Sequence, residues 1–379
     1  MIAPRRAASL IAVEAIPWAK PFVGEEEVEA VTRLLRERRI SMGAEVRALE
    51  SELADIVGRR YGVAVSNGTV ALDLALRLAG IGPGDRVLVS ALSYIATVSS
   101  IVLRGATPVF CDVDPATLNV ASASVGERAT GATALLVADY CGSSVDYAAL
   151  EPICAAEGLK LIVDGAQSLG TLFDGRPTIS RGIVATTSLH TAKSFITGEG
   201  GMVFFDDDAL DDPARRFRGQ GEIPGRKYVH DTLASNYRMT DYAAAIGRVQ
   251  LSRFEAVNAH RAALCGAYDR GFRTAEGVEV VKHHARSVPS HFGYAILVPE
   301  RDRVAAELAA SGIETRSLYP IPAYRQPIPE YAPFSQAVCP NVELAATRVL
   351  NPPLYYEMTE ADVDRVVGAV AASVHSAAR

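Results

Sequence analysis

Val163-Asp164-Gly165-Ala166-Gln167-Ser168 closes an apolar run, and Ser188-Leu189-His190-Thr191-Ala192-Lys193 follows it closely in the sequence. The lysine is followed in turn by the glycine-rich stretch Gly198-Glu199-Gly200-Gly201, which leaves room for a ligand to approach. A lysine amine can form an imine with an aldehyde, and a carboxylate can keep a pyridine nitrogen protonated so that the ring accepts electrons. If Asp164 and Lys193 meet in one pocket, the pair predicts pyridoxal phosphate (PLP) chemistry, in an aminotransferase or a close relative.

The sequence around this stretch alternates short apolar runs with helical patterns up to about residue 205. The runs that we expect to form strands are residues 61–65, 86–89, 108–113, 135–137 and 161–163, and residues 70–78 have a helical pattern. Such alternation is typical of an α/β fold with a mostly parallel sheet that helices cover on both faces. In sheets of this kind ligands bind beyond the carboxyl ends of the strands.

A smaller α+β domain is predicted after a long helical stretch at about 241–272. Its expected elements are strands at 278–281 and 292–297, a helix at 303–310, and a last helix opened by the capping-box pattern Thr359-Glu360-Ala361-Asp362. We therefore divide the chain into a large domain, 16–250, and a small C-terminal domain, 251–379. Segment 319–333 is rich in proline and too long for a plain connection, so we expect it to line a pocket.

Charge and composition exclude several classes of protein. The 379 residues carry 38 basic and 44 acidic side chains, and the formal net charge of −6 argues against nucleic-acid binding or a polybasic membrane surface. The five cysteines have no C-x-x-C pair and the seven histidines no H-x-x-x-H spacing, so we expect reduced thiols and no metal site. No stretch is long enough to span a membrane, and the apolar run 7–13 is interrupted too soon for a signal peptide. The chain is therefore expected to be cytoplasmic.

Each local signal also has a plainer interpretation. Ser66-Asn67-Gly68-Thr69 joins a strand to a helix, where backbone N–H groups could hold a phosphate, but an ordinary N-cap turn has the same pattern. Tyr94 could stack on a cofactor ring or belong to the core. Asp164 could pair with a pyridinium or cap a helix, and most lysines are simply solvated. The small residues and glycines around Lys193 favour the functional interpretation.

Taken together, several motifs occur in one order along the chain. They are Ser66–Thr69, Ser93-Tyr94-Ile95-Ala96-Thr97, the segment 105–114, Asp164–Gln167, Ser188 with Lys193, Thr197–Gly201 and Ser235-Asn236-Tyr237-Arg238-Met239-Thr240-Asp241. This set resembles the DegT/StrS-type sugar aminotransferases of the fold-type I PLP superfamily, over about 16–370. The resemblance implies a large domain with a seven-stranded, mostly parallel sheet flanked by helices, followed by a smaller α+β domain.

The resemblance also implies a role for each matching residue. Lys193 would bond covalently to PLP and move protons, Asp164 would pair with the pyridine nitrogen, and Gln167 would bond the ring hydroxyl. Tyr94 would stack on the ring, and the phosphate would be held by Gly68, Thr69 and Ser188, with Asn236 supplied by the neighbouring subunit of a homodimer. Arg238, Tyr319 and Tyr324 would contact the substrate. Tyr324 stands where many members carry a histidine, so the sugar-binding end is expected to differ.

The function implied is transfer of an amino group from L-glutamate to a keto sugar, linked to a nucleoside diphosphate, with the cofactor alternating between PLP and pyridoxamine phosphate (PMP). His190 before the lysine favours this substrate over a keto-cyclitol aminated by glutamine, which is the first alternative. A non-catalytic regulator that keeps the PLP fold is the second. A dehydrogenase is disfavoured, because no G-x-G-x-x-G follows the strand at 61–65.

Overall fold

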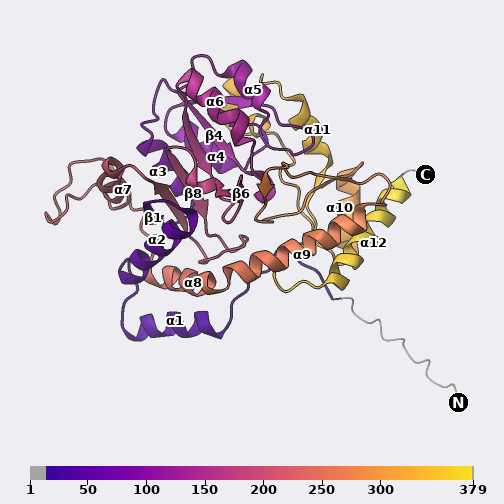
Figure 1. Ribbon diagram of the computed structural model, residues 1–379, viewed down its shortest axis with the longest axis horizontal. Coiled ribbons are helices and arrows are strands. Elements are labelled where there is room, and N and C mark those ends of the chain that lie inside the picture. Colours follow the sequence, from indigo (N-terminus) through magenta and orange to yellow (C-terminus); the bar gives the residue numbers. More distant parts are fainter. Residues whose placement is uncertain (1–13, 378–379) are drawn as a thin grey trace.

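A seven-stranded sheet forms the centre of the computed structural model, which describes residues 14–377 (Figure 1). The strand order is β1-β9-β8-β5-β4-β2-β3, and β9 runs antiparallel to both of its neighbours while the other strands are parallel. The expected mostly parallel sheet of seven strands is therefore confirmed. Its members are β1 (Tyr61–Val65), β2 (Arg86–Ser90), β3 (Thr107–Cys111), β4 (Ala134–Ala138), β5 (Lys160–Asp164), β8 (Val184–Ser188) and β9 (Gly201–Phe205).

Helices cover both faces of the sheet, as the alternation of the sequence predicts. Val87 and Val89 pack into one core with α3 and α4, whereas Leu88 packs into the other core with α2 and α6. The helices of this part are α1 (Glu25–Arg36), α2 (Ala44–Val57), α3 (Gly68–Leu78), α4 (Ile95–Leu103), α5 (Ser122–Arg128), α6 (Tyr147–Glu157) and α7 (Asp211–Arg218). The prediction of a single helical stretch at 241–272 is wrong in one respect. It divides at Arg253, whose backbone is not helical, into α8 (Asp241–Ser252) and α9 (Phe254–Phe272).

A smaller α+β unit follows α9. Its sheet has the order β10-β12-β13, and its elements are β10 (Glu279–Val280), β12 (Ile296–Leu297), α10 (Arg301–Ala310), α11 (Pro340–Arg348), β13 (Val349–Leu350) and α12 (Glu360–Ala377). Thr359 and Asp362 exchange hydrogen bonds of 2.9 and 3.2 Å at the start of α12, which confirms the expected capping box. Ile16 pairs with Ile313 and packs in the core of this unit, so the chain crosses between the two parts near its start. The boundary at residue 250 stays a prediction.

One small sheet joins the two parts through the pairing of β11 (Ser287–Val288) with β6 (Leu172–Phe173), and short 3₁₀ turns complete the fold. This sheet has the order β11-β6-β7, with β7 at Arg176–Pro177, and the 3₁₀ turns are η1 (Tyr140–Gly142), η2 (Thr178–Ser180), η3 (Asp208–Leu210), η4 (Ala323–Arg325) and η5 (Pro329–Phe334). Segment 319–333, expected to be a pocket-lining loop, is therefore partly helical. Tyr324 and Tyr331 within it pack into the core of the large sheet.

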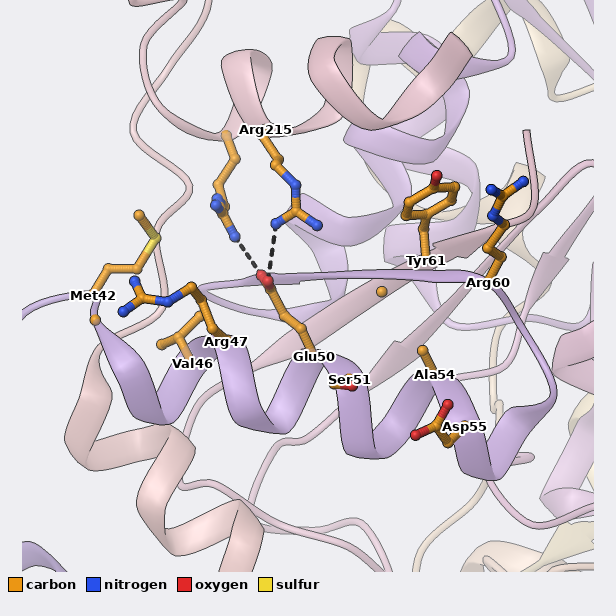
Figure 2. A pocket seen from close by; sticks show the side chains of 13 residues that line it. Met42, Val46, Arg47, Glu50, Ser51, Ala54, Asp55, Arg60, Tyr61 and Arg215 are labelled. Carbon is orange, nitrogen blue, oxygen red and sulfur yellow. Dashed lines mark hydrogen bonds and ion pairs between the residues drawn. The ribbon is translucent and has the colours of Figure 1, made fainter. Parts of the chain in front are cut away.

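The edge strand β1 is covered by charged side chains of α2 and α7. The Glu50 carboxylate accepts a hydrogen bond from the Ala64 backbone N–H (2.9 Å) and is paired with Arg215 (3.0 Å) and Arg218. Figure 2 shows Glu50 between these two guanidinium groups, in a hollow of about 550 Å³ beside α2. Because Glu50 takes up a free N–H of the edge strand, it protects that edge and fixes the strand that leads into Asn67.

No helix within residues 14–377 is long and apolar enough to cross a lipid bilayer. The five cysteines are all unpaired and buried, which confirms the expectation of free thiols. The apolar run 7–13, which we expect not to be a signal peptide, lies outside the described residues.

Candidate active site

A cavity of about 660 Å³ lies at the carboxyl ends of β1, β2, β4, β5 and β8. This is where an α/β sheet of this type places its ligands. Lys193 and Asp164 both line it. So do the residues expected to contact the cofactor from the same chain, namely Gly68, Thr69, Tyr94, Gln167 and Ser188, together with Tyr319. Residues separated by more than 200 positions therefore meet in one pocket.

Asp164 is the last residue of β5, and only 5% of it is exposed. Its carboxylate accepts a hydrogen bond from the Thr97 hydroxyl (2.8 Å) and another from the Ala166 backbone N–H (3.1 Å). Burial raises the pKa of Asp164, while these two donors and the Lys193 ammonium act in the opposite direction. The result is a fixed carboxylate that is costly to keep charged unless a cation lies beside it.

Lys193 lies on a loop that glycines allow to close tightly. Leu189 N–H donates to Gly200 O (2.8 Å), and Gly198 has a φ of +87°, which a residue with a side chain rarely adopts. The Lys193 ammonium lies 4.4 Å from the centre of the Phe292 ring. Burial lowers the pKa of Lys193 to about 8, although Asp164 opposes the shift, so the amine loses its proton far more easily than an ordinary lysine.

The start of α3 forms a small cradle against β8. Asn67 Oδ1 caps the helix by accepting from Val70 N–H (2.9 Å), so the N-cap interpretation holds. The first N–H groups of the helix, at Gly68 and Thr69, face the cavity end of the sheet. A Cβ at Gly68 would lie 2.7 Å from Ser188 Cβ and 3.0 Å from its hydroxyl, so only glycine fits beside Ser188. The cradle therefore combines helix N–H groups with a hydroxyl, which suits a phosphate.

Two tyrosines and a glutamine also line the cavity. Tyr94 is 58% exposed, and its ring lies 6.0 Å from that of Tyr319, between centroids, at a 44° tilt. Gln167 donates from Nε2 to the Tyr319 hydroxyl (2.8 Å) and accepts at Oε1 from the Cys141 backbone N–H (2.8 Å). An exposed aromatic face at the mouth of a cavity is available for stacking on a flat ligand.

The structure does not bring every expected residue to this cavity. Tyr324 is 1% exposed, packs against Phe110 and donates its hydroxyl to Glu343 (2.7 Å), so the expectation that it contacts substrate is wrong. Its aromatic ring fills the core under β3, where the sequence gives no sign of a buried position. Asn236 and Arg238 also lie outside the cavity, where the chain returns to the body of the protein: Asn236 pairs with Gly219 and Arg238 with Val65 at the end of β1.

Sequence reasoning missed several residues of the cavity. Thr97 donates a hydrogen bond to Asp164. It lies in the same motif as Tyr94, one helical turn after it, so the sequence could have indicated it. Trp18, Phe292 and Arg316 come from three distant segments and carry no local signal. Within residues 14–377, no group of three or more His, Cys, Asp or Glu side chains is placed to hold a metal ion.

Comparison with known proteins assigns the family. Residues 21–371 match the DegT/DnrJ/EryC1/StrS aminotransferase family. The chain belongs to this family. It is 36% identical to GDP-perosamine synthase of Caulobacter vibrioides, over 87% of this chain and 90% of the relative, and 32% identical to a pleiotropic regulatory protein of Geobacillus stearothermophilus, over 91% and 94%. Spr1654 of Streptococcus pneumoniae, solved in a PLP form and a PMP form, matches with a TM-score of 0.90 at 25% identity, over 96% of this chain and 99% of that chain.

As a member of this family, the chain is a PLP-dependent sugar aminotransferase. The chemistry of the residues that line the cavity also fits the cofactor. Asp164 is a buried carboxylate that needs a cation, Lys193 is a buried amine with a pKa of about 8, and the cradle at Gly68 and Ser188 suits a phosphate. The fit covers the aldehyde, the ring nitrogen and the phosphate of PLP.

Proposed function

We propose that this protein transfers an amino group from glutamate to a keto sugar carried on a nucleoside diphosphate, and that it works as a homodimer with shared sites. The observation that carries the proposal is the meeting of Lys193 and Asp164 in one cavity with a phosphate cradle. The similarity to GDP-perosamine synthase, whose name denotes a nucleotide-linked amino sugar, supports this class of acceptor.

Each part of the cofactor has a residue of this chain to hold it. Asp164 is assigned to the pyridine nitrogen, Gln167 to the ring oxygen and the exposed face of Tyr94 to the ring. The phosphate is assigned to Gly68, Thr69 and Ser188. When bound, PLP supplies an electron sink that makes the C–H bond next to the transferred nitrogen acidic.

Lys193 carries the proton transfers. Its Nζ takes a proton from the substrate carbon and later returns one, while the amino group stays with the protein between the two halves of the reaction. A base works best when its pKa lies near the working pH, and burial brings the pKa of Lys193 to about 8. Burial makes a charged Asp164 costly, so a positive ring nitrogen beside it, together with the hydrogen bonds from the Thr97 hydroxyl and the Ala166 N–H, would keep it ionised. The closed loop at Gly198 and Gly200 holds the amine in reach of the substrate.

A second candidate function has one observation in its favour. The relative from Geobacillus stearothermophilus is named as a regulatory protein and is 32% identical. A regulator without catalysis would have no need for a buried Lys193 beside a fixed Asp164, and we therefore favour the enzyme. An aminotransferase that uses glutamine and a keto-cyclitol is the alternative within the family, and a direct comparison of glutamate with glutamine as donor distinguishes the two.

Arg238 is assigned to the phosphates of the sugar nucleotide. Among residues 14–377 its guanidinium has one long hydrogen bond, to Gln220 (3.4 Å), which leaves most of its donors for an anion. We expect Arg238→Ala to raise the KM for the sugar nucleotide by about 10- to 100-fold, as loss of a charge-assisted hydrogen bond does. The half-reaction with glutamate should be unchanged, and Arg226→Ala in the same segment is the matched control. An equal loss in both half-reactions would remove this role from Arg238.

The shared-site dimer rests on the segment that follows α7. This segment projects from the body of the protein between α7 and α8 (Figure 1). It carries Leu233 (92% exposed) and Tyr228 (78%), and exposed Asn236 lies at its base, paired with Gly219. Exposed apolar side chains on a projecting arm are typical of a contact with another chain. We propose that Asn236 reaches the phosphate group in the partner's cavity, so that two complete sites need two chains.

Mixed dimers test this sharing. A dimer of one Lys193→Ala chain and one Asn236→Ala chain should have one complete site, because the chain that keeps Lys193 receives Asn236 from its partner. At limiting PLP we expect about half of the wild-type activity, whereas pure Asn236→Ala dimers should bind PLP about 10-fold or more weakly. If the mixed dimer is no more active than pure Asn236→Ala, each Asn236 serves its own chain and the sharing is disproved.

A further inference from the structure

The orientation of the Gln167 amide is fixed by its neighbours. A backbone N–H can only donate, so the Cys141 N–H requires the oxygen of Gln167 on its side, at 2.8 Å. Cys141 is itself held in place, because it has a left-handed φ of 52° in the turn η1. The preceding residue of that turn, Tyr140, donates its N–H to Asn119 (2.9 Å). The nitrogen of Gln167 must therefore face the other way, toward the cavity.

That nitrogen carries two hydrogen atoms, and one of them is already used. Gln167 Nε2 donates to the Tyr319 hydroxyl at 2.8 Å. A hydroxyl oxygen accepts such a bond and keeps its own proton, and burial raises the pKa of Tyr319, so this proton is retained. The bond leaves one N–H of Gln167 for a ligand, with its direction set by Tyr319 on one side and Cys141 on the other.

Tyr319 is in turn anchored through its chain neighbour. The Leu318 N–H donates to Asn351 Oδ1 (2.9 Å), and the Leu318 carbonyl accepts from the Tyr140 hydroxyl. Asn351 is fully buried and also donates to the Tyr294 carbonyl (2.9 Å). The smaller unit therefore places Tyr319 against Gln167, although the two residues are 152 positions apart in the sequence.

We propose that Tyr319 is a positioning residue that holds the Gln167 amide with its second N–H available to the ring oxygen of PLP. The inference rests on the assignment of Gln167 made above. A hydrogen bond from Gln167 would stabilise negative charge on that oxygen, and this charge determines how readily the lysine–cofactor linkage takes up a proton. Tyr319 thus acts on the cofactor through Gln167 and links the smaller unit to the chemistry in the large sheet.

The test is a pH titration of the visible absorption of protein reconstituted with PLP. In Tyr319→Phe the phenyl ring remains but the acceptor for Gln167 is lost, so the midpoint of the titration should rise by about half to one pH unit. Gln167→Ala should give a shift of similar size. In the double variant the Tyr319→Phe change should add nothing, because the residue through which it acts is gone. Tyr331→Phe, which removes a buried hydroxyl bonded to Ser99 (3.0 Å), should titrate like the wild type.

Gln167→Glu provides a second variant, because a carboxylate keeps the shape but has no N–H to donate, and its midpoint should also rise. A Tyr319→Phe midpoint equal to the wild-type value, or a shift that adds fully to that of Gln167→Ala, would overturn this inference but not the proposed function. A wild-type protein without a visible band in PLP would overturn the proposed function and the inference with it.

Discussion

Replacing Lys193 with alanine is expected to lower turnover by at least about 10,000-fold while the protein stays folded. The variant loses both the amine that bonds to the cofactor and the base that moves the proton, and the two losses fall on the same residue. The measurement is steady-state turnover with glutamate as donor, together with circular dichroism to confirm folding. Within residues 14–377 the Lys193 ammonium makes no hydrogen bond and lies over the Phe292 ring, so the fold has little reason to change.

Lys160→Ala is the matched control. Lys160 lies at the start of β5, at the opposite end of the strand from Asp164, and its ammonium donates to the Ala79 carbonyl (2.7 Å). Its loss should cost about 1 kcal/mol of unfolding free energy and leave turnover unchanged. A Lys193→Ala protein that keeps most of its activity would exclude Lys193 from catalysis.

Replacing Asp164 with asparagine should lower turnover by about 100- to 1000-fold. At about 4 Å and an effective dielectric constant of 20, a carboxylate attracts a pyridinium by about 4 kcal/mol before desolvation, which corresponds to about 1000-fold. Asparagine keeps the shape and can still accept from Thr97, but it has no charge to hold the ring nitrogen protonated. The measurement is the rate of the glutamate half-reaction in a stopped-flow instrument.

Thr97→Val gives the graded comparison for Asp164→Asn. Only one of the two hydrogen bonds to the carboxylate disappears, since the Ala166 N–H remains, so the loss should be about 10-fold or less. If Asp164→Asn lost no more than Thr97→Val, the charge of Asp164 would be unimportant and the pairing with the ring nitrogen would be wrong.

Much of the large sheet could be predicted because its strands are short apolar runs. Val87, Leu88 and Val89 pack on both faces of the sheet, so each of them is apolar and the run is recognisable as a strand in the sequence. Strand β8 is different, since Thr186 and Thr187 are buried with hydroxyls bonded to the carbonyls of Val163 (3.5 Å) and Gly165 (3.1 Å). A search for apolar runs cannot recognise such a strand.

The cofactor side of the site could be predicted because its residues follow strand ends, and parallel strands bring those ends together. Asp164, Ser188 and Gly68 are of this kind. The substrate side comes from the smaller unit, where tertiary packing alone decides which residues face the cavity. Tyr319 faces it, whereas Tyr324, five residues later, turns into the core and bonds to Glu343. No periodicity in that proline-rich segment distinguishes the tyrosine that faces the cavity from the one that is buried in the core.

The visible absorption spectrum of the purified protein, supplied with PLP and then with glutamate, tests the proposed function most directly. Transamination through Lys193 requires a yellow band that is lost when glutamate is added and returns with 2-oxoglutarate. Loss of the band with glutamine but not with glutamate would show that glutamine is the donor and would favour the keto-cyclitol alternative. A protein that stays colourless with PLP supplied would contradict the role of Lys193 and favour the regulator.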